Sequence, residues 1–331
     1  MPIATACANI ALVKYWGKRD PALNLPARGS LSLTLDALRT RTEVELVDAP
    51  ADSLEIDGAL EHGRSLERAS RFLDLVRAGA APELARRRAR VISETTFPIA
   101  AGLASSASGF AALAVAAASA YRRALDPPAL SVLARRGSGS AARSIFGGFV
   151  RMHAGVRADG LDAAAVPLDG IALELAAAIA LAGEGEKEVG STEGMELTAR
   201  TSPYYGAWLD TVDRDLDAAE RALRGGDLEA LATIVEGSCL AMHASALAAR
   251  PGILYFKAAT LWAIDRVRAL RQSGVPVMFT IDAGPHLVAL APPSVIDRVA
   301  TALGEHPDVA RVITSPAGEG AHLIGAMPGR A

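Results

Sequence analysis

The chain has 331 residues, half of them hydrophobic, and a formal net charge of −3 at pH 7. This length is sufficient for one large or two fused α/β domains, and the near-neutral charge gives no electrostatic basis for a nucleic-acid partner. Cys7 and Cys239 are too few for a disulfide framework and indicate a cytoplasmic protein. We expect neither a signal peptide nor a membrane partner, because the N-terminus lacks a basic segment and the apolar run 171–183 is too short.

In the first half, alternating apolar residues predict a strand over 42–47, and apolar residues at helical spacing predict a helix over 65–78. Another strand is expected at 88–94. The segment FPIAAGLASSASG, 97–109, is small, polar and punctuated by glycine, and it leads into a strongly helix-forming stretch, 110–125. Pro127 and Pro128 are expected to end that helix.

The order strand, glycine loop, helix predicts a phosphate-binding loop. Gly102 allows the backbone to approach a ligand closely, and the first N–H groups of the following helix are free to bind an anion. Ser105, Ser106 and Ser108 add hydroxyl donors. The loop lacks the lysine of a Walker A motif and the GxGxxG of a dinucleotide fold. A helix start that merely packs closely against a neighbour is the open alternative.

The second half begins with a polar loop, 136–144. Strands are expected at 164–166, 171–181, 277–281, 286–291 and 310–313, and helices at 195–202, 205–224, 228–243, 260–274 and 293–303. Strands followed by helices and then by further strands indicate an α+β fold of two joined lobes. We expect the seam between the lobes near 183–187, where glycine is frequent.

Several segments in order carry a family resemblance. They are NIALVKYWGKRD (9–20), LNLP (23–26), SLSLTL (30–35), the loop from residue 97, SGSAARSIFGGFV (138–150), STEGM (191–195) and FTIDAGP (279–285). Together they resemble the mevalonate diphosphate decarboxylases of the GHMP kinase superfamily, from residue 3 to about residue 290. The resemblance implies a GHMP kinase N-terminal domain over 1–184, with a ribosomal S5 domain 2-like fold. It implies a ferredoxin-like C-terminal domain over 185–331, and an active site in the cleft between them.

The same resemblance implies the reaction. ATP, with Mg²⁺, phosphorylates the 3-hydroxyl of mevalonate 5-diphosphate, and loss of phosphate and CO₂ gives isopentenyl diphosphate. It also implies a homodimer. The alternatives are a mevalonate 5-phosphate decarboxylase, a mevalonate 3-kinase, and a catalytically silent nucleotide-binding protein.

By resemblance, Asp282 orients or deprotonates the substrate hydroxyl, and Lys14 neutralises charge beside it. Arg143 holds the substrate carboxylate with its planar guanidinium, and Ser191 contacts the phosphoryl group in transit. The remaining predicted substrate contacts are Tyr15, Lys18, Ser138, Gly139, Ser140 and Met195. The predicted ATP-phosphate contacts are Ala101, Gly102, Leu103, Ala104, Ser105, Ser106 and Ser108, with Ser106 also the candidate contact for Mg²⁺.

Each of these residues has a structural alternative. Asp282 in a Gly-Pro turn is commonly a turn cap, the two lysines could be solvated, and residues 138–140 could cap a helix. His243 is expected to be a core or supporting residue. The chain departs from the family pattern at four positions, which leaves a 5-diphosphate and a 5-monophosphate substrate both open: Arg28, Gly190, Thr192 and His286.

Overall fold

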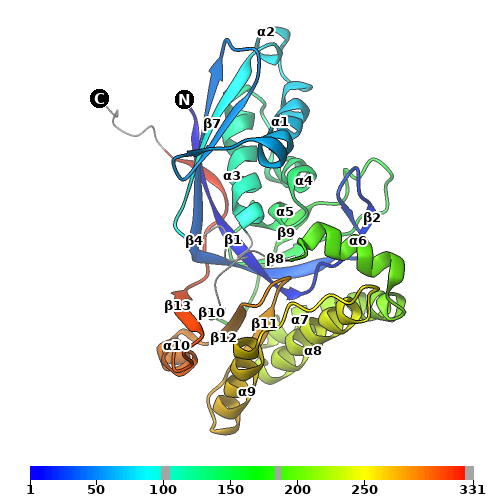
Figure 1. The fold of residues 1–331 in the computed structure, drawn as a ribbon, viewed down its shortest axis with the longest axis vertical. Coiled ribbons are helices and arrows are strands. Elements are labelled where there is room, and N and C mark those ends of the chain that lie inside the picture. Colours follow the sequence, from blue (N-terminus) through cyan, green and yellow to red (C-terminus); the bar gives the residue numbers. More distant parts are fainter. Residues whose placement is uncertain (98–104, 183–187, 325–331) are drawn as a thin grey trace.

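The computed structural model describes residues 1–97, 105–182 and 188–324, which form two lobes (Figure 1). Strands and helices are arranged as the predicted α+β fold requires. Four residues of the predicted phosphate loop, Ala101, Gly102, Leu103 and Ala104, lie outside the described residues, as does the predicted seam at 183–187.

The first lobe is built on an eight-stranded sheet. Its hydrogen-bonded order is β14-β1-β4-β7-β5-β6, with β8 beside β4 and β9 beside β8. Its strands are β1 (Ile3–Val13), β4 (Ser30–Val47), β5 (Ser53–Ile56), β6 (Ala59–Leu60), β7 (Arg88–Thr95), β8 (Phe149–Met152), β9 (Ala165–Pro167) and β14 (His322–Ile324). Its helices are α1 (Gly63–Arg77), α2 (Pro82–Ala85), α3 (Ser105–Ala120), α4 (Pro127–Gly137) and α5 (Ala141–Ser144). A separate two-stranded hairpin is formed by β2 (Lys18–Asp20) and β3 (Leu25–Pro26).

The second lobe is a four-stranded sheet in the order β11-β12-β10-β13. Its strands are β10 (Ala176–Ala182), β11 (Met278–Ile281), β12 (Leu287–Ala291) and β13 (Val309–Ser315). Its helices are α6 (Ser191–Thr201), α7 (Tyr205–Gly225), α8 (Leu228–Leu247), α9 (Ala258–Gln272), the short 3₁₀ turn η2 (Pro293–Val295) and α10 (Ile296–Leu303). By length and composition α8 could cross a membrane, but half of it is buried inside the protein, as expected of a core helix.

Strand β1, which lies between β14 and β4, was not predicted as a strand. Every one of its eleven residues is buried, because α3 packs on one side and α7 and α8 contact the strand as well. A strand covered on both faces loses the alternation that identifies a half-buried strand. The predicted strand 42–47 is only the end of the long partner strand β4.

Several helical segments differ from the predictions. The helix expected at 110–125 is α3, which starts in the serines at Ser105 and already ends at Ala120. Pro127 therefore does not terminate that helix but opens α4, where the Asp126 side chain accepts from the Ala129 N–H. The polar loop 136–144 contains the turn α5, and α6 begins four residues earlier than predicted, at Ser191.

One apolar cluster joins the lobes. It contains Leu12 and Leu33 from the first sheet, Val288 and Leu290 from the second, and Met242 from α8. Burying each such side chain stabilises the fold by roughly 1.5–3 kcal/mol. The two sheets therefore share a packed core, which fixes the strand ends that meet between them.

A buried ion pair anchors α1 to the first sheet. The guanidinium of Arg77 is bonded to both carboxylate oxygens of Asp52, and its Nε donates to the Tyr121 hydroxyl at 3.1 Å. Asp52 also accepts from the Ala89 N–H of β7 at 2.8 Å. Arg77 further bonds Asp74, whose side chain is well exposed.

We expect Asp52→Ala to lower the free energy of unfolding by about 3 kcal/mol, because it leaves Arg77 buried without its counter-ion. Asp74→Ala, which removes an exposed partner of the same arginine, should cost less than about 1 kcal/mol. Urea unfolding of both variants measures the difference, and equal losses would contradict the anchoring role.

Candidate active site

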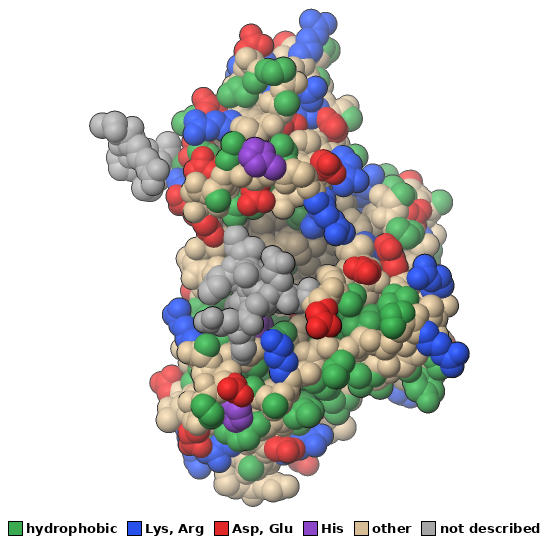
Figure 2. Space-filling view, in the orientation of Figure 1, with side chains coloured by type: hydrophobic (Ala, Val, Ile, Leu, Met, Phe, Trp, Pro, Cys, Tyr) green, Lys and Arg blue, Asp and Glu red, His purple; other side chains and the backbone are tan. Residues whose placement is uncertain are grey.

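A cleft of about 1110 Å³ opens between the two lobes. Figure 2 shows it as a hollow near the middle of the molecule, with Lys and Arg side chains along its upper rim. Both lobes contribute to its walls. The predicted site residues that line it are Lys14, Tyr15, Lys18, Ser105, Ser106, Ser138, Gly139, Ser140, Arg143, Ser191, Met195 and Asp282.

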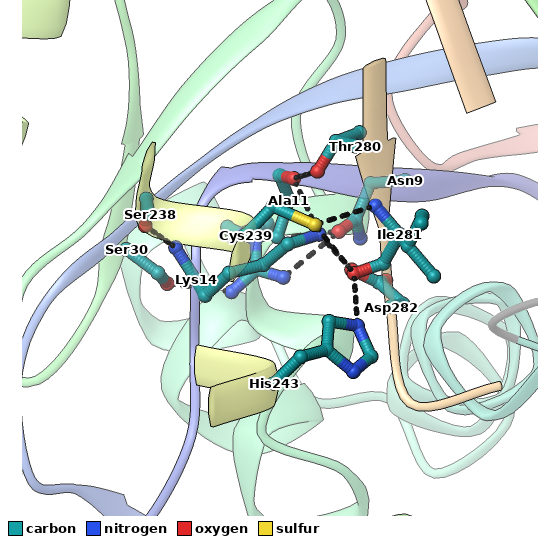
Figure 3. A network of polar contacts seen from close by, with 11 residues as sticks. Asn9, Ala11, Lys14, Ser30, Ser238, Cys239, His243, Thr280, Ile281 and Asp282 are labelled. Carbon is teal, nitrogen blue, oxygen red and sulfur yellow. Dashed lines mark hydrogen bonds and ion pairs between the residues drawn. The ribbon is translucent and has the colours of Figure 1, made fainter. Parts of the chain in front are cut away.

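Lys14 and Asp282 both line this cleft and form an ion pair with each other (Figure 3). Lys14 follows β1 and Asp282 follows β11, so two strand ends bring together residues 268 positions apart. The Lys14 Nζ donates to Asp282 Oδ1 at 2.6 Å and to the Ala11 carbonyl oxygen at 3.0 Å. The lysine side chain is 2% exposed and the aspartate side chain 36% exposed. The carboxylate can therefore reach a ligand while the ammonium group stays fixed behind it.

Arg143 is a buried cation on α5, only 2% exposed. Its Nη1 donates to the Ser30 hydroxyl at 2.6 Å and its Nη2 to Asn9 Oδ1 at 3.0 Å. Burial lowers the pKa of Arg143 to about 10, and the nearby Asp282 carboxylate opposes that change. Within the described residues no carboxylate lies at ion-pair distance from Arg143. A buried charge without a counter-ion is costly, so this guanidinium is suited to an anionic ligand.

The Tyr15 hydroxyl is another polar group available to a ligand in the cleft. It is buried and has no hydrogen-bond partner among the described residues. Burial raises the pKa of Tyr15, so the hydroxyl keeps its proton at neutral pH. A Cβ on Gly139 would lie 2.3 Å from this hydroxyl oxygen, so glycine is required there for Tyr15 to lie against the cleft wall. Lys18 on β2 is partly buried, and burial lowers its pKa.

The predicted serines divide into two groups. Ser138 Oγ donates to Ser106 Oγ at 3.2 Å and lies 3.2 Å from Ser140 Oγ, so these three hydroxyls form one polar wall. Ser108, in contrast, is fully buried, and its hydroxyl is 2.7 Å from the Thr40 hydroxyl. The predicted contact of Ser108 with phosphate is therefore not supported, because the next turn of α3 points this side chain into the sheet.

The start of α6, in the second lobe, also lines the cleft with Gly190, Ser191, Thr192 and Met195. The N-cap residue of this helix, Gly190, has no side chain that could cap its first N–H groups. Such a helix start favours an anion through its free N–H groups and the helix dipole.

Sequence reasoning missed the cationic side chains that α1 adds to the cleft: Arg64, Arg68 and Arg71, together with Arg136 from α4. The sequence does contain a pattern that indicates them, because spacings of four and three residues place the α1 arginines on one helix face. Burial lowers the pKa of Arg68, and Arg64 and Arg71 lower it further. With Lys14, Lys18 and Arg143, the described residues of the lining include seven cationic side chains against two carboxylates, Asp74 and Asp282.

The four residues that depart from the family pattern do not all lie in the cleft. Gly190 and Thr192 line the cleft. Arg28 instead donates to the Leu209 carbonyl at 3.2 Å, and His286 accepts the Ala182 N–H at 3.1 Å. His243 is a buried residue of α8, as expected, with its Nε2 3.1 Å from the Ile281 carbonyl oxygen.

Comparisons with known proteins agree over both lobes. Residues 6–165 match the family described as "Diphosphomevalonate decarboxylase-like N-terminal domain", and residues 177–317 match "Mevalonate 5-diphosphate decarboxylase C-terminal domain". A diphosphomevalonate decarboxylase of Candida albicans is 36% identical over 315 residues, which is 91% of this chain and 87% of that protein.

Solved structures show the same similarity. Mevalonate diphosphate decarboxylase from Staphylococcus aureus superposes with a TM-score of 0.92 and 36% identity, covering 98% of each chain. A structure of MDDEF in complex with MVAPP, AMPPCP and magnesium gives a TM-score of 0.91 and 39% identity, covering 98% of this chain and 99% of the other. The similarity therefore extends through both walls of the cleft.

Proposed function

Because the chain belongs to the diphosphomevalonate decarboxylase family, we propose that it converts mevalonate 5-diphosphate and ATP to isopentenyl diphosphate, ADP, phosphate and CO₂. It is an ATP-dependent carboxy-lyase of the mevalonate pathway of isoprenoid biosynthesis. The expectation drawn from the sequence motifs is thereby confirmed at the level of the family and its reaction.

The observation that carries this proposal is the charge of the cleft. In the described part of the lining, seven cations face two carboxylates, and one of the cations, Arg143, is buried with no carboxylate of that part at ion-pair distance. The phosphate groups of both substrates and the carboxylate of mevalonate 5-diphosphate supply negative charge that balances these cations. A site for two polyanions is therefore the chemistry that this cleft supports best.

The residues around the Lys14–Asp282 pair form the substrate side. Asp282 accepts the proton of the 3-hydroxyl as the γ-phosphoryl group of ATP is transferred to its oxygen. Lys14 offsets the charge of Asp282 and of the phosphoryl group in transit, which Ser191 also contacts. Arg143, with Ser138 and Ser140 nearby, holds the substrate's anionic groups, and Tyr15 and Lys18 bind its diphosphate.

Decarboxylation follows from the same positions. The C–O bond to the new phosphate breaks, and the electrons of the bond to the carboxylate form the alkene as CO₂ leaves. Arg143 holds the carboxylate in place until that bond breaks, because a planar guanidinium forms two parallel hydrogen bonds to it. Met195, which is buried at the cleft wall, lies against the apolar part of the substrate.

The nucleotide side combines the start of α3 with α1. Ser105 and Ser106 stand where free N–H groups and hydroxyls can bind phosphate oxygens, and Arg64, Arg68 and Arg71 add positive charge. The predicted contacts from Ala101 to Ala104 lie outside the described residues and stay predictions.

The donor set also fits Mg²⁺ carried on the ATP phosphates. In the described parts of the chain no three His, Cys, Asp or Glu side chains cluster as metal ligands. Mg²⁺ in nucleotide sites commonly takes phosphate oxygens and water with only one or two protein ligands. The Ser106 hydroxyl on the cleft wall is the group that would contact it, and the ion would neutralise charge on the phosphates.

Three further assignments complete the proposal. The domain boundary lies ahead of β10 rather than at the predicted 184/185, because β10 hydrogen-bonds to β12 and β13 of the second sheet. The enzyme acts in the cytoplasm, which suits two buried cysteines that are both free thiols. It acts as a homodimer, as the family resemblance implies.

The direct test is an assay with ATP, Mg²⁺ and one of three substrates: mevalonate 5-diphosphate, mevalonate 5-phosphate or mevalonate. We expect equal amounts of ADP and CO₂ from the 5-diphosphate. ADP without CO₂ would identify a kinase. CO₂ from the 5-phosphate alone would identify a monophosphate decarboxylase. No product from any of the three substrates would contradict the proposal that the protein is an enzyme.

Asp282→Asn should lower kcat by at least about two orders of magnitude, the usual loss when a general base is removed. Asp265→Asn, on the exposed face of α9, is the matched control and should keep full activity. Steady-state kinetics of both variants check this, and near-normal kcat in Asp282→Asn would remove Asp282 from the chemistry.

Arg143→Ala should lower kcat/KM for mevalonate 5-diphosphate by about two orders of magnitude or more, while ATP binds within about threefold of its normal affinity. Arg143→Lys keeps the charge but loses the planar fork, and should recover only part of the rate. Titration calorimetry with ATP, run beside the kinetics, measures both effects. A parallel loss of ATP affinity would reassign Arg143 to the nucleotide side.

A further inference from the structure

Helix α8 lies directly behind the Lys14–Asp282 pair and contacts both β1 and β11. Three of its buried side chains, Ser238, Cys239 and His243, point toward the strand ends that carry the pair (Figure 3). None of the three lines the cleft. Their contacts are therefore with the protein backbone that supports the site.

Side chains of α8 form hydrogen bonds with backbone groups of the edge strand β11. β11 has β12 on one side only, so its outward N–H and C=O groups lack a strand partner. The Ile281 N–H donates to Cys239 Sγ at 3.2 Å, and the His243 Nε2 lies 3.1 Å from the Ile281 carbonyl oxygen. Glu236, farther along the same helix, accepts the Phe279 N–H at 3.2 Å. Both backbone groups of Ile281, the residue before Asp282, are thus fixed by α8.

On β1, the same helix fixes the residue that carries the ammonium group. The Lys14 N–H donates to the Ser238 hydroxyl at 3.1 Å. The Ala11 carbonyl accepts both from the Lys14 Nζ and from the Thr280 hydroxyl of β11, each at 3.0 Å. The two strand ends are therefore joined to each other and to α8.

The His243 ring is held as a neutral donor. It is 3% exposed, and its ring centre lies 4.4 Å from that of Phe256 and 6.0 Å from that of Tyr255. Burial lowers the pKa of His243 to about 4, and the nearby Lys14 charge lowers it further. A carbonyl oxygen only accepts, so Nε2 carries the proton of the neutral imidazole. The ring thus contributes a hydrogen bond and no charge.

We propose that Ser238, Cys239 and His243 are positioning residues that fix the backbones of Lys14 and Ile281 and thereby hold the ammonium group against Asp282. The proposal rests on the catalytic roles proposed above for Lys14 and Asp282. A displacement of about 1 Å at a reacting group can cost about a hundredfold in rate, so backbone supports away from the substrate can govern turnover.

The test compares His243→Phe, which fills the space but cannot donate, with His243→Gln, whose amide nitrogen can occupy the place of Nε2. We expect the phenylalanine variant to lose about tenfold or more in kcat with KM for both substrates within about twofold, and glutamine to restore most of the loss. Ser245→Ala is the control on the same helix, since its buried hydroxyl donates to the Met242 carbonyl of α8 itself. It should leave kcat unchanged.

A double variant distinguishes an effect on the position of Asp282 from a general loss of structure. In an Asp282→Asn background, His243→Phe should lower kcat by less than about twofold more, because its effect acts through Asp282. A crystal structure of His243→Phe should show the Lys14 Nζ beyond hydrogen-bond distance from Asp282. Unchanged kcat in His243→Phe, no rescue by glutamine, or full additivity with Asp282→Asn would each overturn the proposal.

Ser238→Ala provides a second route if the phenylalanine variant does not fold. It removes only the acceptor of the Lys14 N–H, and it should lower kcat about fivefold, again without additivity to Asp282→Asn. Equal activity in Ser238→Ala and the parent would overturn the proposal. The parent enzyme is measured in parallel, and absence of CO₂ release from the parent would show that the proposed function fails. In that case the crystal structure of His243→Phe still tests whether α8 holds Lys14 against Asp282.

Discussion

The Lys14–Asp282 ion pair is the contact on which the arrangement of this molecule depends. It joins the end of β1, in the first lobe, to the end of β11, in the second, with the ammonium group almost fully buried. Removing one partner of such a pair would leave the other charge desolvated and alone. The two sheets must therefore meet at a fixed distance, and the apolar core shared by both lobes provides that constraint.

Around the pair, the described residues that line the cleft carry more cationic side chains than carboxylates. Arg143 is held by Asn9 and Ser30, which are neutral acceptors that orient the guanidinium without cancelling its charge. Tyr15 keeps a buried hydroxyl that has no hydrogen-bond partner in the part of the chain that the structure describes. Such unsatisfied groups cost stability in the absence of ligand, and that cost is offset when an anion binds. Functional demands, rather than stability, explain why these residue types are present.

The α8 contacts extend this argument away from the substrate. An edge strand needs partners for its outward N–H and C=O groups, and here a helix supplies them with side chains. The same hydrogen bonds that complete β11 also fix the residue before Asp282, so one set of contacts contributes both to stability and to the geometry of the site.

The sequence by itself determined the family, the α+β class and most helices of the second lobe, because these depend on local patterns: helical spacing, glycine turns and short motifs. It could not determine β1, because burial on both faces removes the alternation of apolar and polar residues. It also could not determine α4, because its two prolines indicate the end of the preceding helix as well as they indicate the start of a new one. Only the tertiary structure decided that Ser108 faces the sheet, that α1 turns its arginines into the cleft, and that α8 supports the catalytic pair. The physical reason is that a side chain's neighbours across the fold depend on how the elements pack, and no local pattern encodes a contact between residues 268 positions apart.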